Sequence, residues 1–81
     1  MKPSRSDLTI KEILEAVINE MVEKGIYWND ARQQFEKLFL IRILRQCRGN
    51  LLRASETMGV HRNTLTKKLR DYGLDKRTFR G

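Results

Sequence analysis

The stretch RGNLLRASETMGVHRNTLTKKLRDYG, residues 48–73, decides the fold class. Its three glycines, Gly49, Gly59 and Gly73, bound two short segments in which apolar residues recur at helical spacing. The stretch also holds six of the chain's 17 lysines and arginines. Two features of this stretch require an explanation: the interruption between two helical segments and the concentration of cations in the second segment.

The two segments have the lengths and the connection of a helix-turn-helix unit. Asn50 is placed to cap a first short helix over residues 51–58. Gly59 provides the positive φ that a tight turn requires, and a second helix is expected over residues 62–72. Two short helices joined by a tight turn that contains glycine form this motif.

The second of these helices has one apolar and one polar face. Leu65, Leu69 and Tyr72 recur at i, i+4 and i+7 and predict its buried stripe. The residues on the other side are polar or cationic: Asn63, Thr66, Lys67 and Arg70, with Arg62 at the N-terminal tip. Such a helix suits the DNA major groove, where its first residues would meet base edges and its cations would meet phosphates. A structural pair of helices with a solvated basic face is the alternative.

The positive charge of the chain lies in its C-terminal part. Residues 1–47 carry eight Lys or Arg and seven Asp or Glu, a net charge of +1, and residues 48–81 carry nine and three, a net charge of +6, which together give the formal +7. A one-sided positive field favours nucleic acid first, then an anionic membrane, then an acidic protein.

A first long helix is expected over residues 9–24. Thr9 and Glu12 form a capping box, and a glycine follows as the left-handed stop. Apolar residues recur at spacings of three and one, as on one face of a helix: Ile10, Ile13, Leu14, Val17, Ile18, Met21 and Val22. Tyr27 and Trp28 come next, and we interpret them as a plug for the corner of a helical hairpin. A stacking platform for bases is the alternative.

A second long helix is expected to begin at Asn29 or Asp30, both good N-caps, and to end near Cys47. The four consecutive apolar residues 38–41 cover about 300° of a helix, so this helix is apolar on most sides. Such a surface is difficult to bury within 81 residues. We therefore expect the helix to pack on its own domain and on a second copy of the chain, with a monomeric bundle as the alternative.

The whole chain is predicted to form one all-α domain of four helices with a marginal core. Cys47 is the only cysteine and His61 the only histidine, so we expect no disulfide within the chain, no metal site and no cofactor. No phosphate-binding glycine loop and no nucleophile–base set is present, so no enzyme is expected. The chain has neither a signal-peptide core nor a run near the roughly 20 apolar residues of a membrane span, so a cytoplasmic location is expected.

The C-terminal residues resemble the Fis family, which includes the bacterial nucleoid protein Fis and the DNA-binding domains that end NtrC-type enhancer-binding activators. The similarity rests on short strings of residues: Arg48-Gly49-Asn50, Arg53-Ala54, Met58-Gly59-Val60, Arg62-Asn63-Thr64-Leu65, Lys67-Lys68-Leu69 and Tyr72-Gly73-Leu74. Over residues 8–47 the similarity is looser and rests on the number and order of helices.

The resemblance implies a protomer whose two long helices intertwine with those of a second copy to form an obligate homodimer core. Residues 8–47 would be the helical hairpin for dimerisation, residues 48–74 the helix-turn-helix that binds DNA, and residues 75–81 a basic tail. The implied dimer contacts are apolar: Ile13, Val17, Met21, Phe35, Leu38, Phe39 and Ile43. Degenerate, roughly palindromic sites and DNA bending are also implied, because the two recognition helices would lie closer together than one turn of straight DNA.

Carried over by position, the resemblance makes Arg62 the main base-reading side chain, bidentate to guanine O6 and N7, with His61 just before it. Contacts to the DNA backbone are implied for six residues: Arg48, Asn50, Arg53, Thr64, Lys67 and Lys68. Contacts at the flanks of bent DNA are implied for Arg70, Lys76, Arg77 and Arg80. Asn63 and Thr66 complete the exposed face, and base preference at Thr66 is open because the family often has a basic residue there.

A protein-interaction module that docks partners through its helical hairpin is the rival hypothesis from another class. Within DNA binding, the chain would be a free-standing Fis-like protein or the terminal domain of a larger activator. Met1 and a chain that opens directly into a capped helix favour the first. The seven residues before Leu8 are too few for the β-hairpin arm through which Fis contacts recombinases, so recombinase stimulation is not expected.

Overall fold

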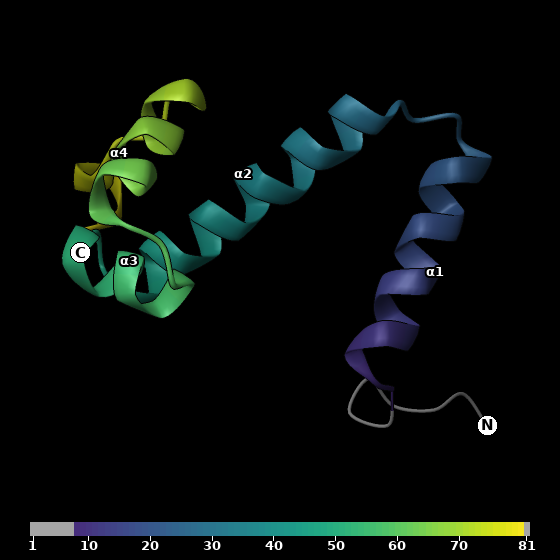
Figure 1. The fold of residues 1–81 in the computed structure, drawn as a ribbon, viewed down its shortest axis with the longest axis horizontal. Coiled ribbons are helices and arrows are strands. Elements are labelled where there is room, and N and C mark those ends of the chain that lie inside the picture. Colours follow the sequence, from purple (N-terminus) through teal and green to yellow (C-terminus); the bar gives the residue numbers. More distant parts are fainter. Residues whose placement is uncertain (1–7, 81) are drawn as a thin grey trace. The chain divides into compact units, whose positions relative to one another are not determined.

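The computed structural model describes residues 8–80, and in this part the chain forms four α-helices and no β-strand (Figure 1). The elements are α1 (Ile10–Glu23), α2 (Trp28–Gln46), α3 (Leu51–Met58), α4 (Arg62–Asp71) and a short 3-10 helix, η2 (Lys76–Phe79). The predicted all-α class and helix order are confirmed. The expected lack of an N-terminal arm concerns residues 1–7, which lie outside the described residues. The chain divides into two compact units, and the boundary between them falls within α2, after Arg32.

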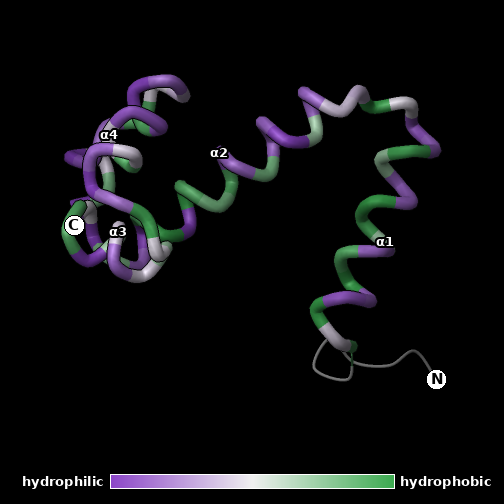
Figure 2. Tube along the Cα trace, in the orientation of Figure 1, coloured by the Kyte–Doolittle hydropathy of each residue, from purple (hydrophilic) through white to green (hydrophobic). Residues whose placement is uncertain are grey.

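Helix α1 starts and stops where its sequence predicts. The Thr9 hydroxyl accepts a hydrogen bond from the Glu12 backbone N–H at 3.1 Å, and the Glu12 carboxylate accepts one from the Thr9 N–H at 3.2 Å. Gly25, with φ of 70°, ends the helix in the left-handed region. Apolar and polar residues alternate along α1 at helical spacing (Figure 2), yet none of its residues is buried. Within the described residues of its own unit, the apolar face of α1 is therefore left uncovered.

Helix α2 begins one or two residues before the predicted start. It starts at Trp28, so Asn29 and Asp30 lie in the first turn and do not cap it. The first helical bond runs from the Ala31 N–H to the Tyr27 carbonyl oxygen, at 3.0 Å. Tyr27 and Trp28 are 79% and 80% exposed, so the corner-plug interpretation is wrong for the single chain.

The second unit, from Gln33 onward, has its own hydrophobic core. Seven buried residues form it, six from α2, α3 and α4 and one, Cys47, just after α2: Leu40, Ile43, Leu44, Cys47, Ala54, Leu65 and Leu69. Further residues pack against them from the two ends of α3, the turns and the tail: Leu51, Met58, Val60, Tyr72, Leu74 and Phe79. Each fully buried leucine contributes roughly 1.5–3 kcal/mol of transfer free energy, so this core holds the last two helices in place.

Two left-handed turns set the directions of α3 and α4. Arg48 and Gly49, with φ of 51° and 75°, turn the chain between α2 and α3. Gly59, with φ of 72°, ends α3 and lets the Val60 N–H donate to the Ser55 carbonyl oxygen at 3.0 Å. This bond closes the helix end in a Schellman motif, and Val60 packs against the core.

A polar contact ties α4 to α2 within the second unit. The Glu36 carboxylate accepts a hydrogen bond from the Tyr72 hydroxyl at 2.5 Å and pairs with the Lys68 ammonium at 3.3 Å. All three groups are partly buried, and a partly buried carboxylate is stabilised by such donors. The contact fixes the angle at which α4 leaves the core.

Candidate nucleic-acid interface

The α3–α4 pair has the geometry of a helix-turn-helix. Asn50 caps α3, its side-chain oxygen accepting from the Arg53 N–H at 3.1 Å. Ala54 and Leu65 are fully buried where the two helices meet, so the small residue allows close approach. The predicted Asn50 cap, the Gly59 turn and the span of α3 over residues 51–58 are confirmed.

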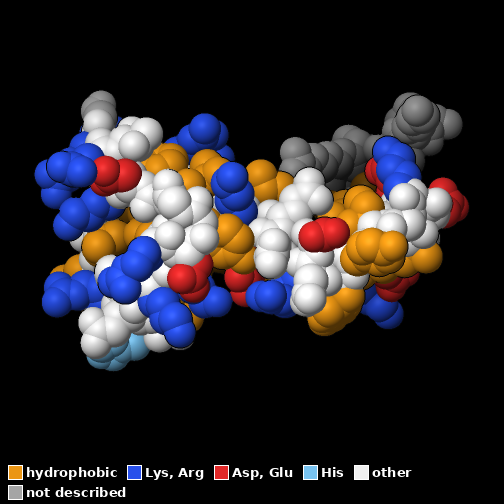
Figure 3. All heavy atoms as spheres, turned by 90° about the horizontal axis from the view of Figure 1, so that it is seen from above, with side chains coloured by type: hydrophobic (Ala, Val, Ile, Leu, Met, Phe, Trp, Pro, Cys, Tyr) orange, Lys and Arg blue, Asp and Glu red, His pale blue; other side chains and the backbone are white. Residues whose placement is uncertain are grey.

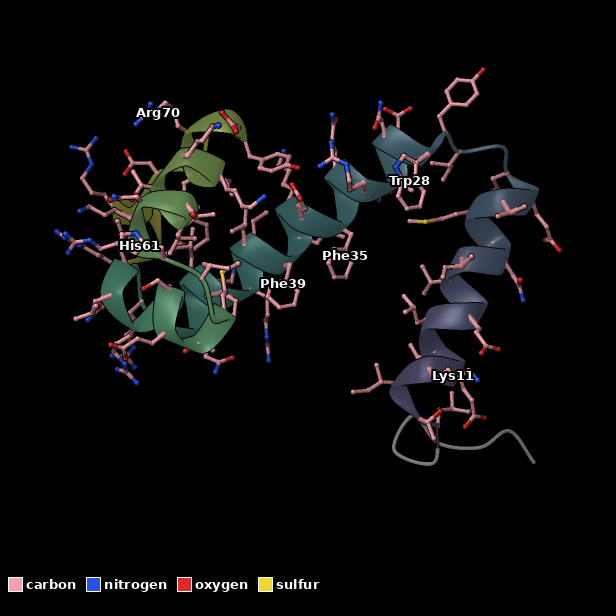
Figure 4. The ribbon with its side chains drawn as sticks, viewed as in Figure 1. Lys11, Trp28, Phe35, Phe39, His61 and Arg70 are labelled. Atoms are coloured by element: carbon pink, nitrogen blue, oxygen red, sulfur yellow. The ribbon has the colours of Figure 1, made fainter. Side chains whose placement is uncertain are left out.

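Helix α4 is held by one face and presents the other to solvent. Leu65 and Leu69 are buried, and Tyr72 is partly buried beside them. The predicted DNA-contacting residues on the opposite side are exposed: Arg62, Asn63, Thr64, Lys67 and Arg70. Figure 3 shows lysine and arginine side chains gathered over the part of the chain that carries α3 and α4, and Figure 4 shows Arg70 extending away from α4. The predicted apolar stripe of Leu65, Leu69 and Tyr72 is therefore confirmed.

His61 has a role that its sequence did not reveal. Its Nδ1 accepts a hydrogen bond from the Asn63 backbone N–H at 3.0 Å, so the imidazole is the N-cap of α4. His61 is otherwise exposed at the tip of the helix, beside Arg62. A histidine just before a helix start is the only sequence signal for this cap, and it is weak because Ser, Thr, Asp and Asn are the usual N-caps.

Two predicted contact residues have other partners. The Lys68 side chain is 35% exposed and paired with Glu36, so it lies on the side of α4 that faces α2. The Thr66 side chain is partly exposed, and its hydroxyl donates to the Arg62 carbonyl oxygen at 3.0 Å within α4. Lys68 therefore lies apart from the exposed cationic face, whereas the bond of Thr66 is internal to its own helix.

The loop before α3 and the chain end after α4 come together in a basic pocket. Arg48, Asn50 and Arg62 line it with Lys76 and Arg80, around a volume of about 660 Å³. No acidic residue of the described chain lines this pocket. We use the name basic pocket for this site. The structure thus brings together residues that the sequence placed in three separate segments.

The tail after α4 contains the short 3-10 helix η2. The Asp75 carboxylate caps η2 by accepting from the Arg77 N–H at 2.9 Å, and it pairs with the Arg77 guanidinium at 2.8 Å. These donors from Arg77 lower the pKa of Asp75 to about 2. Arg77, which forms this ion pair, does not line the basic pocket that Lys76 and Arg80 line.

Arg45 was not predicted as a functional residue. It lines a smaller hollow of about 430 Å³ with Arg48, Phe79 and Arg80. No local pattern predicts this position of Arg45, because it depends on how the tail returns to the end of α2.

The predicted dimer residues fall into three groups by burial. Four are exposed, namely Val17, Phe35, Leu38 and Phe39, and two are intermediate, namely Ile13 and Met21. Phe35 and Phe39 project from the same side of α2 (Figure 4), with ring centroids 5.6 Å apart. Ile43 is 8% exposed and belongs to the core of the second unit, so the structure does not offer it for a dimer contact.

Residues 8–80 hold no group of three or more His, Cys, Asp or Glu side chains placed to bind a metal ion. Within the same part of the chain, no helix is both long and apolar enough to cross a membrane.

Known proteins resemble this chain over the same region. Residues 31–72 match the family described as "Bacterial regulatory protein, Fis family". The DNA-binding protein Fis of Buchnera aphidicola is 32% identical over 82 residues, which cover 88% of this chain and 83% of that protein. A Fis-like DNA-binding protein of Neisseria meningitidis is 49% identical over 50 residues, 62% of each chain.

A Fis-like DNA-binding protein of Xylella fastidiosa is 43% identical over 47 residues, 58% of this chain. The match covers 52% of that relative, so the chain spans about half of its length. No solved structure matches the chain. The family match covers more than half of the 81 residues and includes α3, α4 and most of α2. The chain belongs to the Fis family of bacterial regulatory proteins.

Proposed function

We propose that this chain is a homodimeric, sequence-preferring DNA-binding protein that regulates transcription or organises the bacterial nucleoid in the cytoplasm. The observation that carries the proposal is the orientation of α4, whose apolar stripe is buried while Arg62, Asn63 and Lys67 are exposed. The names of the relatives support DNA as the partner. The proposal makes the chain a binding protein and not an enzyme.

In the proposed complex α4 lies in the major groove and α3 crosses the DNA backbone. Arg62, at the N-terminal tip of α4, would bind guanine O6 and N7, with His61 and Asn63 beside it. Thr64 and Lys67 would bind phosphates. These assignments are supported by exposure and by place on the helix, whereas the pairing of Lys68 with Glu36 argues for a structural role there.

Phosphate contacts would also come from α3 and from the flanks. The residues proposed for them are Arg48, Asn50, Arg53 and Arg70, all of which are exposed. The Asn50 side-chain oxygen is used as a cap, so its amide group would be the donor to a phosphate. Backbone contacts of this kind fix the position of α4 without reading sequence.

A second copy of the chain is the proposed partner of the exposed apolar side chains. On α1, Ile10, Leu14 and Val22 are 85%, 47% and 72% exposed, and on α2 the phenylalanines at 35 and 39 are 58% and 44% exposed. Apolar surface of this extent marks an interaction site. A symmetric dimer would bury the same faces on both copies, with residues 8–39 as the main contacts. Two α4 helices closer than one turn of straight DNA would then bend the duplex.

Fluorescence anisotropy with a duplex of about 30 base pairs tests the proposal, with a palindromic library and a scrambled duplex titrated in parallel over salt. A log–log slope of about −0.9 per phosphate contact, with selection of a palindromic subset, is expected. A steep slope without selection would indicate packaging of DNA without sequence preference. No submicromolar binding at low salt would contradict the proposal and would favour a protein-interaction module.

A further inference from the structure

The C-terminal tail is ordered against the turn that precedes α3. Phe79 packs on the core of the second unit, and the Lys76 carbonyl oxygen lies so close to Gly49 that a Cβ at this glycine would overlap it. Asp75 caps η2 and holds Arg77 by an ion pair. The last cations of the described chain therefore have fixed places.

The tail divides its three cations between two environments. Lys76 and Arg80 line the basic pocket, and in the described chain no ion pair neutralises either of them. Arg77 is paired with Asp75 and does not line the basic pocket. The three residues carry the same charge, but only Lys76 and Arg80 line the basic pocket.

The basic pocket adjoins the end of α4 that is proposed to read bases. Arg62 lines the pocket and also forms the tip of α4, and Arg48 lies between the pocket and the smaller hollow that Arg45 lines. Four cations with no acidic residue in the lining favour an anion, and the fixed polyanion nearest to a base contact is the adjoining DNA backbone.

We propose that the segment from Asp75 to Arg80 is an additional DNA-binding element, in which Lys76 and Arg80 bind backbone phosphates beside the base contacted by Arg62. The segment lies outside the part of the chain that matches the family, residues 31–72. This inference rests on the proposed DNA-binding function and adds a contact that the helix-turn-helix alone does not make.

The test compares three variants of the full chain that each remove one tail cation: Lys76→Ala, Arg80→Ala and, as the matched control, Arg77→Ala. Anisotropy titrations over salt use one preferred duplex. Because the proposed dimer carries two copies of each residue, Lys76→Ala and Arg80→Ala should each flatten the log–log slope by about 1.8 and weaken binding about sixtyfold at 0.1 M salt, since each lost contact releases about 0.9 fewer counterions. Arg77→Ala should leave the log–log slope unchanged and should change the DNA affinity by no more than about twofold. The charge-conserving variants Lys76→Arg and Arg80→Lys should bind DNA as the wild type does. Circular dichroism confirms that each variant is folded.

Neutral methylphosphonate linkages, placed one at a time along the flanks, identify the phosphate. At one flanking position per half-site, the neutral linkage should weaken wild-type binding and leave the doubly substituted Lys76→Ala, Arg80→Ala variant unaffected. Equal losses in all three single variants would overturn the inference and leave only a general positive field.

Inorganic phosphate distinguishes a small-anion site from a DNA contact. Calorimetric binding of inorganic phosphate that depends on Lys76 and Arg80, with unchanged DNA affinity in the variants, would also overturn the inference. A wild-type chain that binds no DNA at low salt would remove the proposed function and this inference together. A wild-type chain that binds DNA while the tail variants match the control removes the inference alone.

Discussion

Arg62 and Lys67 are both exposed cations on α4, but they are expected to act differently on DNA. Arg62→Ala should cost about 1–3 kcal/mol on a preferred site and relax its base preference, because a bidentate contact to guanine is lost. Lys67→Ala should weaken all duplexes alike and reduce the salt slope by about one for each copy of the chain in the dimer. Anisotropy on preferred and scrambled duplexes separates the two effects. Identical behaviour of the two variants would contradict the assigned roles.

His61 is at once the cap of α4 and a neighbour of the base-reading residue. Its Nδ1 accepts from the Asn63 N–H, so the first turn of α4 depends on an acceptor at this position. Removing the acceptor should therefore weaken the start of α4, whereas a direct contact of His61 with DNA would be lost in any substitution that removes the imidazole ring.

The His61→Asn variant keeps a capping acceptor and removes the imidazole ring. If the cap is the main contribution of His61, His61→Asn should bind DNA as tightly as the wild type, whereas His61→Ala should bind it more weakly. His61→Ala, which removes the acceptor, should cost about 0.5–2 kcal/mol in urea unfolding. A His61→Asn variant that is as stable as the wild type but binds DNA more weakly would show that a direct contact of the imidazole is the stronger effect.

Asp75 reports whether the tail cap forms in solution. Its side-chain and backbone bonds from Arg77 hold its pKa at about 2, below the ordinary 3.8. Because the folded-state pKa is the lower one, the cap's contribution to stability is complete above about pH 3.8 and is lost as the pH falls through about 2. Carbon-detected NMR titration of Asp75 should give the low pKa in the wild type and a value closer to 3.8 in Arg77→Ala. An equal pKa in both proteins would mean that the pair does not form.

At the scale of the helices, the packing of α4 on α3 decides stability. Leu65 is fully buried between them, so Leu65→Ala should cost about 2–5 kcal/mol through lost transfer free energy and the cavity left behind. Leu52→Ala removes the same atoms from a side chain that is 56% exposed and should stay within about 0.5 kcal/mol. Urea unfolding followed by circular dichroism measures both, and similar losses would contradict the observed burial.

Local sequence signals predicted most of these elements. Capping bonds and left-handed glycines act within a few residues, so the Thr9 cap, the Asn50 cap and the Gly59 turn could be read from the chain. The start of α2 could not, because Asn29 and Asp30 suit an N-cap by type although the helix already begins at Trp28.

The parts of the site that escaped prediction depend on contacts between distant residues. Lys68 has a cationic side chain on the recognition helix, and only the folded position of Glu36, 32 residues earlier, shows that it faces inward. The tail likewise reaches the basic pocket through the contact of the Lys76 carbonyl oxygen with Gly49. Patterns of charge and spacing along α4 carry no information about either contact.

At the scale of the whole molecule, the exposed apolar face of α1 predicts an oligomer. Val17→Glu places a charge on this face and should raise the dimer dissociation constant by more than about tenfold, since burying an unpaired charge is costly. Asn19→Glu places the same charge on an exposed polar position of the same helix and should leave the dimer intact. Sedimentation equilibrium measures both. A wild type that stays monomeric at high micromolar concentration would contradict the dimer.

The single cysteine of the chain, buried in the core of the second unit, makes the protein its own reporter of opening. A thiol reagent reaches Cys47 only in molecules whose α2, α3 and α4 have separated, so the labelling rate follows the population of that open form. A ligand that binds only the closed form lowers this population, by about a hundredfold at a concentration of 100 times its dissociation constant. Labelling of the unmodified chain thus distinguishes DNA that engages the helix-turn-helix from DNA held elsewhere, without any introduced probe.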